Sequence, residues 1–161
     1  MHYLVDGYSV IHARPDLRKA LSKRLAHARN LLLDQLQRYQ DHAGEAVTVF
    51  FDGCSGPDSN PPKAKKKRMV ISCTPPGTVI GIIFSKQGQS ADTLIEQCVG
   101  QSHTPSEYLV VTADHAIENT ISALGASSSS PDNFFEIINR AEEEFSEWLI
   151  DHRMRTKRKF S

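Results

Sequence analysis

The chain has 161 residues, the length of one ordinary domain, and its 39% hydrophobic and 24% charged content is typical of a soluble globular protein. Lysine plus arginine balance aspartate plus glutamate at 19 each, so the net charge gives no sign of a polyanionic partner. No apolar run approaches the ~18 residues of a membrane span, and three widely spaced cysteines form neither a zinc-ligand pattern nor a disulfide framework. A cytoplasmic protein without a membrane partner is expected.

The charge is nevertheless unevenly distributed along the chain. One dense run of cations consists of Lys63, Lys65, Lys66, Lys67 and Arg68. A second run lies within residues 151–161, where no aromatic side chain alternates with the cations. We interpret residues 1–150 as the folded domain and residues 151–161 as a flexible basic tail that keeps the protein soluble.

The first half of the chain predicts two buried strands around a helix. Residues 3–5 form a short apolar run that ends at Asp6-Gly7, and residues 47–51 form a strongly β-prone run that ends at Asp52-Gly53. Between them, apolar residues recur every three or four positions over residues 16–42, which predicts one amphipathic helix. Residues 53–64 are rich in glycine, serine and proline and are expected to be a loop.

The second half alternates strands and helices. Strands are predicted at residues 69–72, 79–84 and 108–111, and helices after Ser90, after Asp114 and from Ser130-Pro131 to about residue 149. The serines at 127–130 are a short low-complexity stretch. Continuous apolar strands that alternate with helices indicate an α/β fold in three layers, with a central, mostly parallel sheet flanked by helices.

Four aspartates follow the predicted strands. Asp6, Asp52 and Asp114 come at or just after strand ends, and Asp92 opens the helix after the third buried strand. Each one alone is an ordinary turn or capping residue. Ligands of open parallel sheets bind outside the carboxyl ends of the strands, so all four are expected at one rim. Four carboxylates gathered there would repel one another unless a cation neutralised them.

A divalent metal site is therefore predicted at this rim. Hard oxygen ligands without histidine or cysteine favour Mg²⁺ or Mn²⁺ over zinc. Such an ion lowers the pKa of a bound water and neutralises charge in phosphodiester cleavage. The cation run at residues 63–68 follows the second buried strand, which places it near the rim as a candidate contact for a phosphate backbone. A solvated loop is an equally good interpretation of that run.

The motifs around these aspartates resemble those of the YacP-like NYN domains, a bacterial branch of the PIN-like nuclease superfamily. The matching segments are Leu4-Val5-Asp6-Gly7-Tyr8-Ser9-Val10-Ile11-His12, Val49-Phe50-Phe51-Asp52, Phe84-Ser85-Lys86-Gln87-Gly88-Gln89-Ser90-Ala91-Asp92 and Val110-Val111-Thr112-Ala113-Asp114. Together they span about residues 2–146. Their order and spacing carry the resemblance.

The resemblance implies a PIN-like fold and a Mg²⁺- or Mn²⁺-dependent endoribonuclease of RNA processing or decay, in a family that includes ribosome-associated enzymes. Asp6, Asp52, Asp92 and Asp114 would be its catalytic and metal-binding set. Ser9 stands where the family usually has asparagine, and it would be a substrate contact together with the cation run. Serine is shorter than asparagine, so this contact is lost or bridged by water in the present chain.

A second interpretation therefore stays open: an RNA- or ribosome-binding PIN-like module with weak or no cleavage. Ser9 favours it, and the four retained aspartates oppose it. A phosphatase with an aspartate nucleophile is disfavoured because Tyr8 occupies the position of its second aspartate. Neither GxGxxG nor GxxxxGK[ST] is present, which disfavours a nucleotide-binding fold. The sequence does not determine the oligomeric state.

Overall fold

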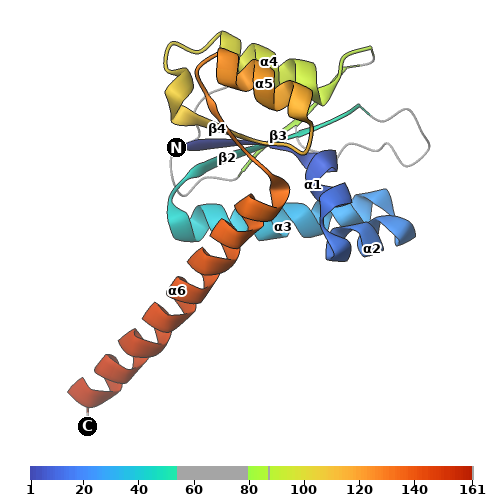
Figure 1. The fold of residues 1–161 in the computed structure, drawn as a ribbon. Helices are drawn as coiled ribbons and strands as arrows, with labels where there is room; N and C mark the ends of the chain where they lie inside the picture. The colour runs from blue at the N-terminus through green and yellow to red at the C-terminus, as the bar shows by residue number, and fades with distance from the viewer. Residues whose placement is uncertain (54–79, 87, 161) are drawn as a thin grey trace.

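The structure, a computed structural model, describes residues 1–53, 80–86 and 88–160. Figure 1 shows a sheet with helices on both faces and one long helix that leaves the domain. In chain order the elements are β1 (His2–Asp6), α1 (Gly7–Ala13), α2 (Pro15–Lys23), α3 (Leu25–Ala43), β2 (Ala46–Phe51), β3 (Gly81–Phe84), α4 (Ala91–Gly100), a 3-10 turn (Pro105–Glu107), β4 (Tyr108–Val111), α5 (His115–Ala123), β5 (Ser127–Ser129) and α6 (Pro131–Lys159).

The sheet has five strands in the order β3-β2-β1-β4-β5, and all four strand pairs within the described residues are parallel. β1 is therefore central, with β2 and β4 as its neighbours. This confirms the predicted α/β architecture with a central parallel sheet between helical layers. The predicted strand at 69–72 and the loop at 53–64 fall at positions 54–79, outside the described residues, apart from Gly53 at the start of that loop.

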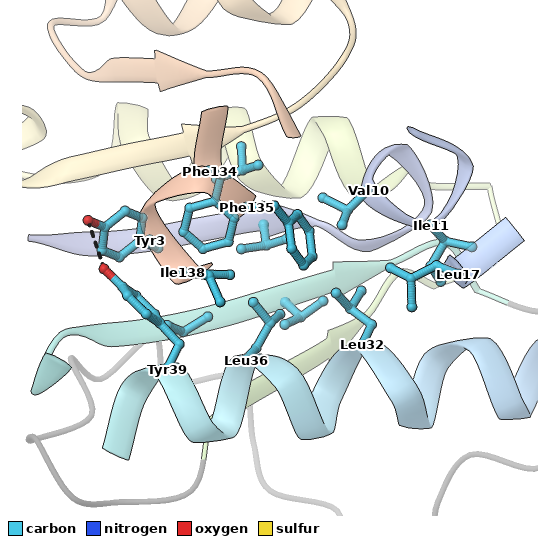
Figure 2. Close-up of a cluster of buried hydrophobic side chains, with 14 of the residues drawn as sticks. Tyr3, Val10, Ile11, Leu17, Leu32, Leu36, Tyr39, Phe134, Phe135 and Ile138 are labelled. Atoms are coloured by element: carbon cyan, nitrogen blue, oxygen red, sulfur yellow. Dashed lines mark hydrogen bonds between the residues drawn. The ribbon is translucent and has the colours of Figure 1, made fainter. Parts of the chain in front are cut away.

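The alternation of side chains along the strands builds two hydrophobic cores. Tyr3 and Val5 of β1 point to the face covered by α1, α2, α3 and the first turns of α6, whereas Leu4 points to the face covered by α4 and α5. Figure 2 shows the first core, where the Tyr39 hydroxyl of α3 donates to the Tyr3 hydroxyl over 3.2 Å. Phe134 of α6 is fully buried against both tyrosine rings. Both faces of β1 are thus buried, which explains its continuous apolar sequence.

The helix predicted over residues 16–42 is interrupted in the structure. Arg24 is extended (φ −157°, ψ 136°) and separates α2 from α3. An additional helix, α1, precedes Pro15, which occupies the first position of α2. No glycine or proline stands at the second break, so propensity gave no signal for it. The break allows α2 to pack back against α3, with Leu17 and Leu32 in the same core.

Two further differences concern the C-terminal third. The serine-rich stretch contains β5, an edge strand whose register on β4 pairs Leu109 with Ser127. Serine has no preference for strands, so pairing with β4 decides this conformation. The segment expected to be a flexible tail is helical, because α6 continues to Lys159. The domain boundary at residue 150 itself stays a prediction.

Candidate metal and nucleic-acid site

The carboxyl ends of the parallel strands form one edge of the sheet, and the predicted aspartates lie along it. Asp6 is the last residue of the central strand β1 and is paired in register with Phe50 of β2. Asp52 follows β2 directly, and Asp114 comes three residues after β4. Asp92 enters from the first turn of α4. The topology therefore places all four at the same edge, as the sequence predicts.

Asp6 is the most enclosed of the four. Only 7% of this residue is exposed, and its carboxyl caps α1 by accepting from the Ser9 amide over 3.5 Å. Burial and, to a smaller extent, the charge of Asp92 raise the pKa of Asp6 to about 6, against the hydrogen bonds from Ser9 that favour the carboxylate. Asp6 is thus held as a carboxyl that gains a proton far more easily than an exposed aspartate.

Asp92 is coupled to the other three aspartates. The pKa of this half-buried carboxyl is raised by burial and by the charges of Asp52 and Asp114. A hydrogen bond joins it to Asp6; this bond raises the pKa of Asp6 and lowers that of Asp92. The opposite effects of this bond mean that the two carboxyls hold protons with different ease, Asp6 more readily than it would alone. The edge is therefore a single electrostatic unit of four carboxyls.

Asp52 and Asp114 are exposed, and each accepts a hydrogen bond from an amide at the start of a helix. The Ala91 amide at the start of α4 donates to Oδ1 of Asp52 over 2.7 Å. The Ala116 amide at the start of α5 donates to Oδ1 of Asp114 over 2.8 Å. These hydrogen bonds give each aspartate an ordinary structural role, and Asp114 is the N-cap of α5. They also hold the two carboxyls on either side of the buried Asp6–Asp92 pair, so the structural role and the proposed site coexist.

The donor set suits a hard divalent cation, because all four groups supply carboxylate oxygen. In the described part of the chain, no three histidine, cysteine, aspartate or glutamate side chains are grouped as ligands of one ion. A divalent cation bound at this edge would relieve the mutual repulsion of the carboxyls.

Ser9 connects the first aspartate to the next strand along the sheet. Its amide and its side chain both hydrogen-bond Asp6. Its Oγ also accepts from the Ala113 amide, over 3.4 Å. The hydroxyl therefore lies between the end of β1 and the turn that carries Asp114. In this geometry Ser9 positions neighbouring groups through its hydrogen bonds. The contact with substrate that the sequence suggests for Ser9 stays a prediction.

Two hydroxyl residues at the edge were missed by the sequence analysis. The buried Ser85 accepts from the Gly53 amide over 2.7 Å, and it donates its own amide to the Phe51 carbonyl over 2.9 Å. The fully buried Thr112 accepts from the Asp114 amide over 3.1 Å. A serine or threonine directly after a buried strand is the signal that points to them. Both residues shape the turns that present Asp52 and Asp114.

Close packing at the edge depends on Gly7. A Cβ on Gly7 would clash with the Phe51 ring. The absence of a side chain at this position lets α1 start directly above β2, which brings Ser9 into reach of Asp6. The glycine of the first motif thus has a steric reason.

The predicted phosphate contacts Lys63, Lys65, Lys66, Lys67 and Arg68 lie outside the described residues. Their role stays a prediction. Lys86, which follows Ser85, is exposed next to the edge and is a cation within the described part of the chain.

Comparison with known proteins agrees with this architecture. A model of the YacP-like NYN domain matches residues 3–161, nearly the whole chain. The chain belongs to the YacP-like NYN domain family. This family lies within the PIN-like nucleases, so membership supports a nuclease or RNA-related role. Nucleases of this superfamily generally use divalent metal ions.

The relatives come from Bacillus subtilis. Uncharacterized protein YacP of strain 168 is 27% identical over 124 residues, which cover 76% of this chain and 66%, just under two thirds, of YacP. The crystal structure of Rae1 (YacP) is 25% identical with a TM-score of 0.70, covering 94% of this chain and 80% of that one. A tryptophan-to-leucine variant of Rae1 shows the same fold, with a TM-score of 0.69 at 24% identity over 91% of this chain and 79% of that one.

Proposed function

We propose that this member of the YacP-like NYN family is a Mg²⁺- or Mn²⁺-dependent endoribonuclease of cytoplasmic RNA processing or decay. The observation that carries the proposal is the group of four carboxyls at the carboxyl edge of the sheet. Asp92 hydrogen-bonds Asp6 there, and the charges of Asp52 and Asp114 raise its pKa. Family membership supports RNA as the class of substrate. Association with the ribosome belongs to the same proposal.

The protein's own residues would act by binding and orientation. Asp6, Asp52, Asp92 and Asp114 would hold the metal. The bound ion would supply a water of lowered pKa and neutralise charge on the cleaved phosphate. Ser9 would keep Asp6 and the turn before Asp114 in fixed relation through its two hydrogen bonds. Lys86 and the cation run would contact phosphates beside the scissile bond.

The test is cleavage of labelled RNA by the full chain. Single-stranded and hairpin RNAs are incubated with Mn²⁺, with Mg²⁺ and with EDTA, beside Asp6→Asn and Asp92→Asn. Asp34→Asn is the matched control, because Asp34 is an exposed aspartate of α3 away from the edge. Cleavage is expected only with the metal, in the wild type and in Asp34→Asn. Activity that survives EDTA or either edge substitution refutes the metal–aspartate mechanism.

The second candidate function, an RNA- or ribosome-binding module with weak cleavage, is favoured by Ser9. The same assay separates the two, because a binding module retains RNA without cutting it in either metal. Restoration of cleavage by Ser9→Asn would identify the missing amide as the cause. Unchanged, efficient cleavage in the wild type refutes the module.

A further inference from the structure

The distal part of α6 is a helical extension that stands apart from the domain. Phe145 stacks on His42 of α3 at 4.0 Å between ring centroids, and Arg38 of α3 pairs with Glu142 over 3.7 Å. Beyond these contacts α6 leaves the sheet and its other helices, as Figure 1 shows in red. Residues 146–159 extend it by roughly 21 Å at 1.5 Å per residue. We call residues 146–159 the α6 extension.

An aromatic ladder runs onto this extension. Phe145 stacks with Trp148 at an interplanar angle of 19°, and Trp148 stacks with His152 at 12°. Trp148 is nevertheless 56% exposed. The neighbouring rings fix its orientation, so little side-chain entropy remains to be lost when a flat partner packs against it. A large exposed indole held in this way indicates a binding surface.

The ladder leads into a segment of cations. After Asp151 the described chain carries five cations and no acid: Arg153, Arg155, Lys157, Arg158 and Lys159. At 100° per residue they surround the helix. Favourable interaction with the helix dipole accounts for the three in the last turn, but not for Arg153 and Arg155. The Asp151–Arg155 ion pair of 2.9 Å joins successive turns of the helix and supports the helical conformation of this charged segment.

A second copy of the chain is a poorer match for this surface. Ile150 and Met154 are exposed and one turn apart, which would start an apolar seam. One turn before Ile150 this line meets Glu147, two turns before it meets Glu143, and one turn after Met154 it meets Lys157 and Arg158. A coiled coil needs an apolar seam that repeats over several heptads. The seam here is too short, whereas charge complementarity points to a polyanion.

We propose that the α6 extension is an RNA-binding arm in which the cations contact phosphates and the Trp148 ladder packs against bases or ribose. The combination of a backbone-tracking positive surface with an exposed aromatic platform is the requirement for sequence-tolerant RNA binding. The arm extends the proposed function, because RNA is the substrate class proposed for the site. It holds RNA away from the carboxyl edge, since α6 starts near α1 and projects toward the opposite side of the domain.

Binding by the full chain is measured by fluorescence anisotropy with labelled single-stranded RNA in EDTA, over a range of salt concentrations. One variant combines Arg153→Gln, Lys157→Gln and Arg158→Gln, and another is Trp148→Ala. The matched control combines Arg18→Gln, Lys19→Gln and Lys23→Gln, which removes the same charge from exposed positions of α2. Glutamine keeps the helix propensity close to that of lysine and arginine, and circular dichroism checks that helicity is retained.

The α6 triple variant is expected to bind RNA roughly 100-fold more weakly at about 0.1 M salt. Its plot of log affinity against log salt concentration should be less steep by about 2, because each phosphate contact contributes about 0.7 to that slope. Trp148→Ala is expected to lose roughly tenfold with an unchanged slope. The α2 control should bind nearly as the wild type. The proposal of an RNA-binding arm is refuted if both triple variants lose the same RNA affinity, or if the α6 variant loses none. It is also refuted if the wild type does not bind RNA.

Two further measurements separate the arm from its rivals. If sedimentation equilibrium shows a dimer that Trp148→Ala dissociates while RNA affinity is unchanged, the surface belongs to a second copy and the arm is refuted. Cleavage of a dinucleotide, too short to reach α6, should be equal in all variants that keep the four aspartates. If the wild type cleaves nothing but the α6 variants still lose RNA affinity, the proposed nuclease fails and the arm stands.

Discussion

Replacing Asp6 by asparagine should stabilise the protein while abolishing its proposed activity. In the folded chain, burial raises the pKa of Asp6 from 3.8 to about 6. The ionised form is therefore disfavoured by folding, and wild-type stability falls as pH rises from 3.8 through 6. Asparagine has no such ionisation, yet it caps a helix as well as aspartate does, and its amide can donate to Asp92, the hydrogen-bond partner of Asp6.

The magnitude follows from the shift. Two pKa units at 1.36 kcal/mol each correspond to about 3 kcal/mol of stability, which Asp6→Asn should recover above pH 6. For a chain of this size the gain is a rise of roughly 6–12 °C in Tm. Below pH 3.8 Asp6 is protonated in both states, so the difference between the variant and the wild type should vanish there. The gain must therefore grow with pH and then level off.

The assay is urea denaturation from pH 4 to 8 in EDTA, so that no cation compensates the charge. Asp34→Asn serves as the control, because the same chemical change on the exposed face of α3 should leave stability nearly unchanged at every pH. A variant that is less stable than the wild type at pH 8, or a gain that is the same at pH 4 and pH 8, would refute the reasoning. Either result would mean that Asp6 is not strained by its burial.

Further consequences follow from the same geometry. Mn²⁺ at pH 8 should raise the Tm of the wild type and narrow its gap to Asp6→Asn; an equal rise in both proteins would show that the ion binds elsewhere. Asp52→Ala should lower the free energy of unfolding by about 0.5–2 kcal/mol through loss of the hydrogen bond that Asp52 accepts from the first amide of α4, whereas Asp52→Asn should keep stability and lose cleavage. Ser9→Ala should lower kcat roughly tenfold, since a hydrogen bond to a charged group is worth about 1.5–3 kcal/mol; unchanged kcat at saturating RNA would remove Ser9 from the site. Gly7→Ala should cost about 1–3 kcal/mol in thermal unfolding, because its Cβ meets the Phe51 ring; an unaltered Tm would show that the ring moves freely.

The pattern of residues was sufficient to predict the layers and the edge. β1 and β2 are continuous apolar runs because both of their faces are buried, and the same pattern is what marks them as strands of a parallel sheet. Once the strands are parallel, the residues that follow them must share an edge. Asp6, Asp52 and Asp114 could therefore be placed together without coordinates.

Other features needed long-range contacts. The break at Arg24 has no local breaker and is decided by packing of α2 on α3. The strand at Ser127–Ser129 forms because β4 supplies its hydrogen-bonding partners. The basic run from Arg153 onward was interpreted as a flexible tail because its composition is highly charged, whereas α6 carries the helix through it from a buried anchor at Phe134 and Phe135.

For the candidate site, the sequence determined which carboxyls meet, because strand ends and helix starts are local signals. It did not determine how deeply each carboxyl is buried. Asp6 is buried and Asp52 is exposed, although each comes at the end of an apolar run and precedes a glycine. The difference arises because β1 is central in the sheet and α1 closes over its end. Burial depends on neighbours distant in sequence, so the raised pKa of Asp6 and its hydrogen bond with Asp92 depend on the tertiary structure alone.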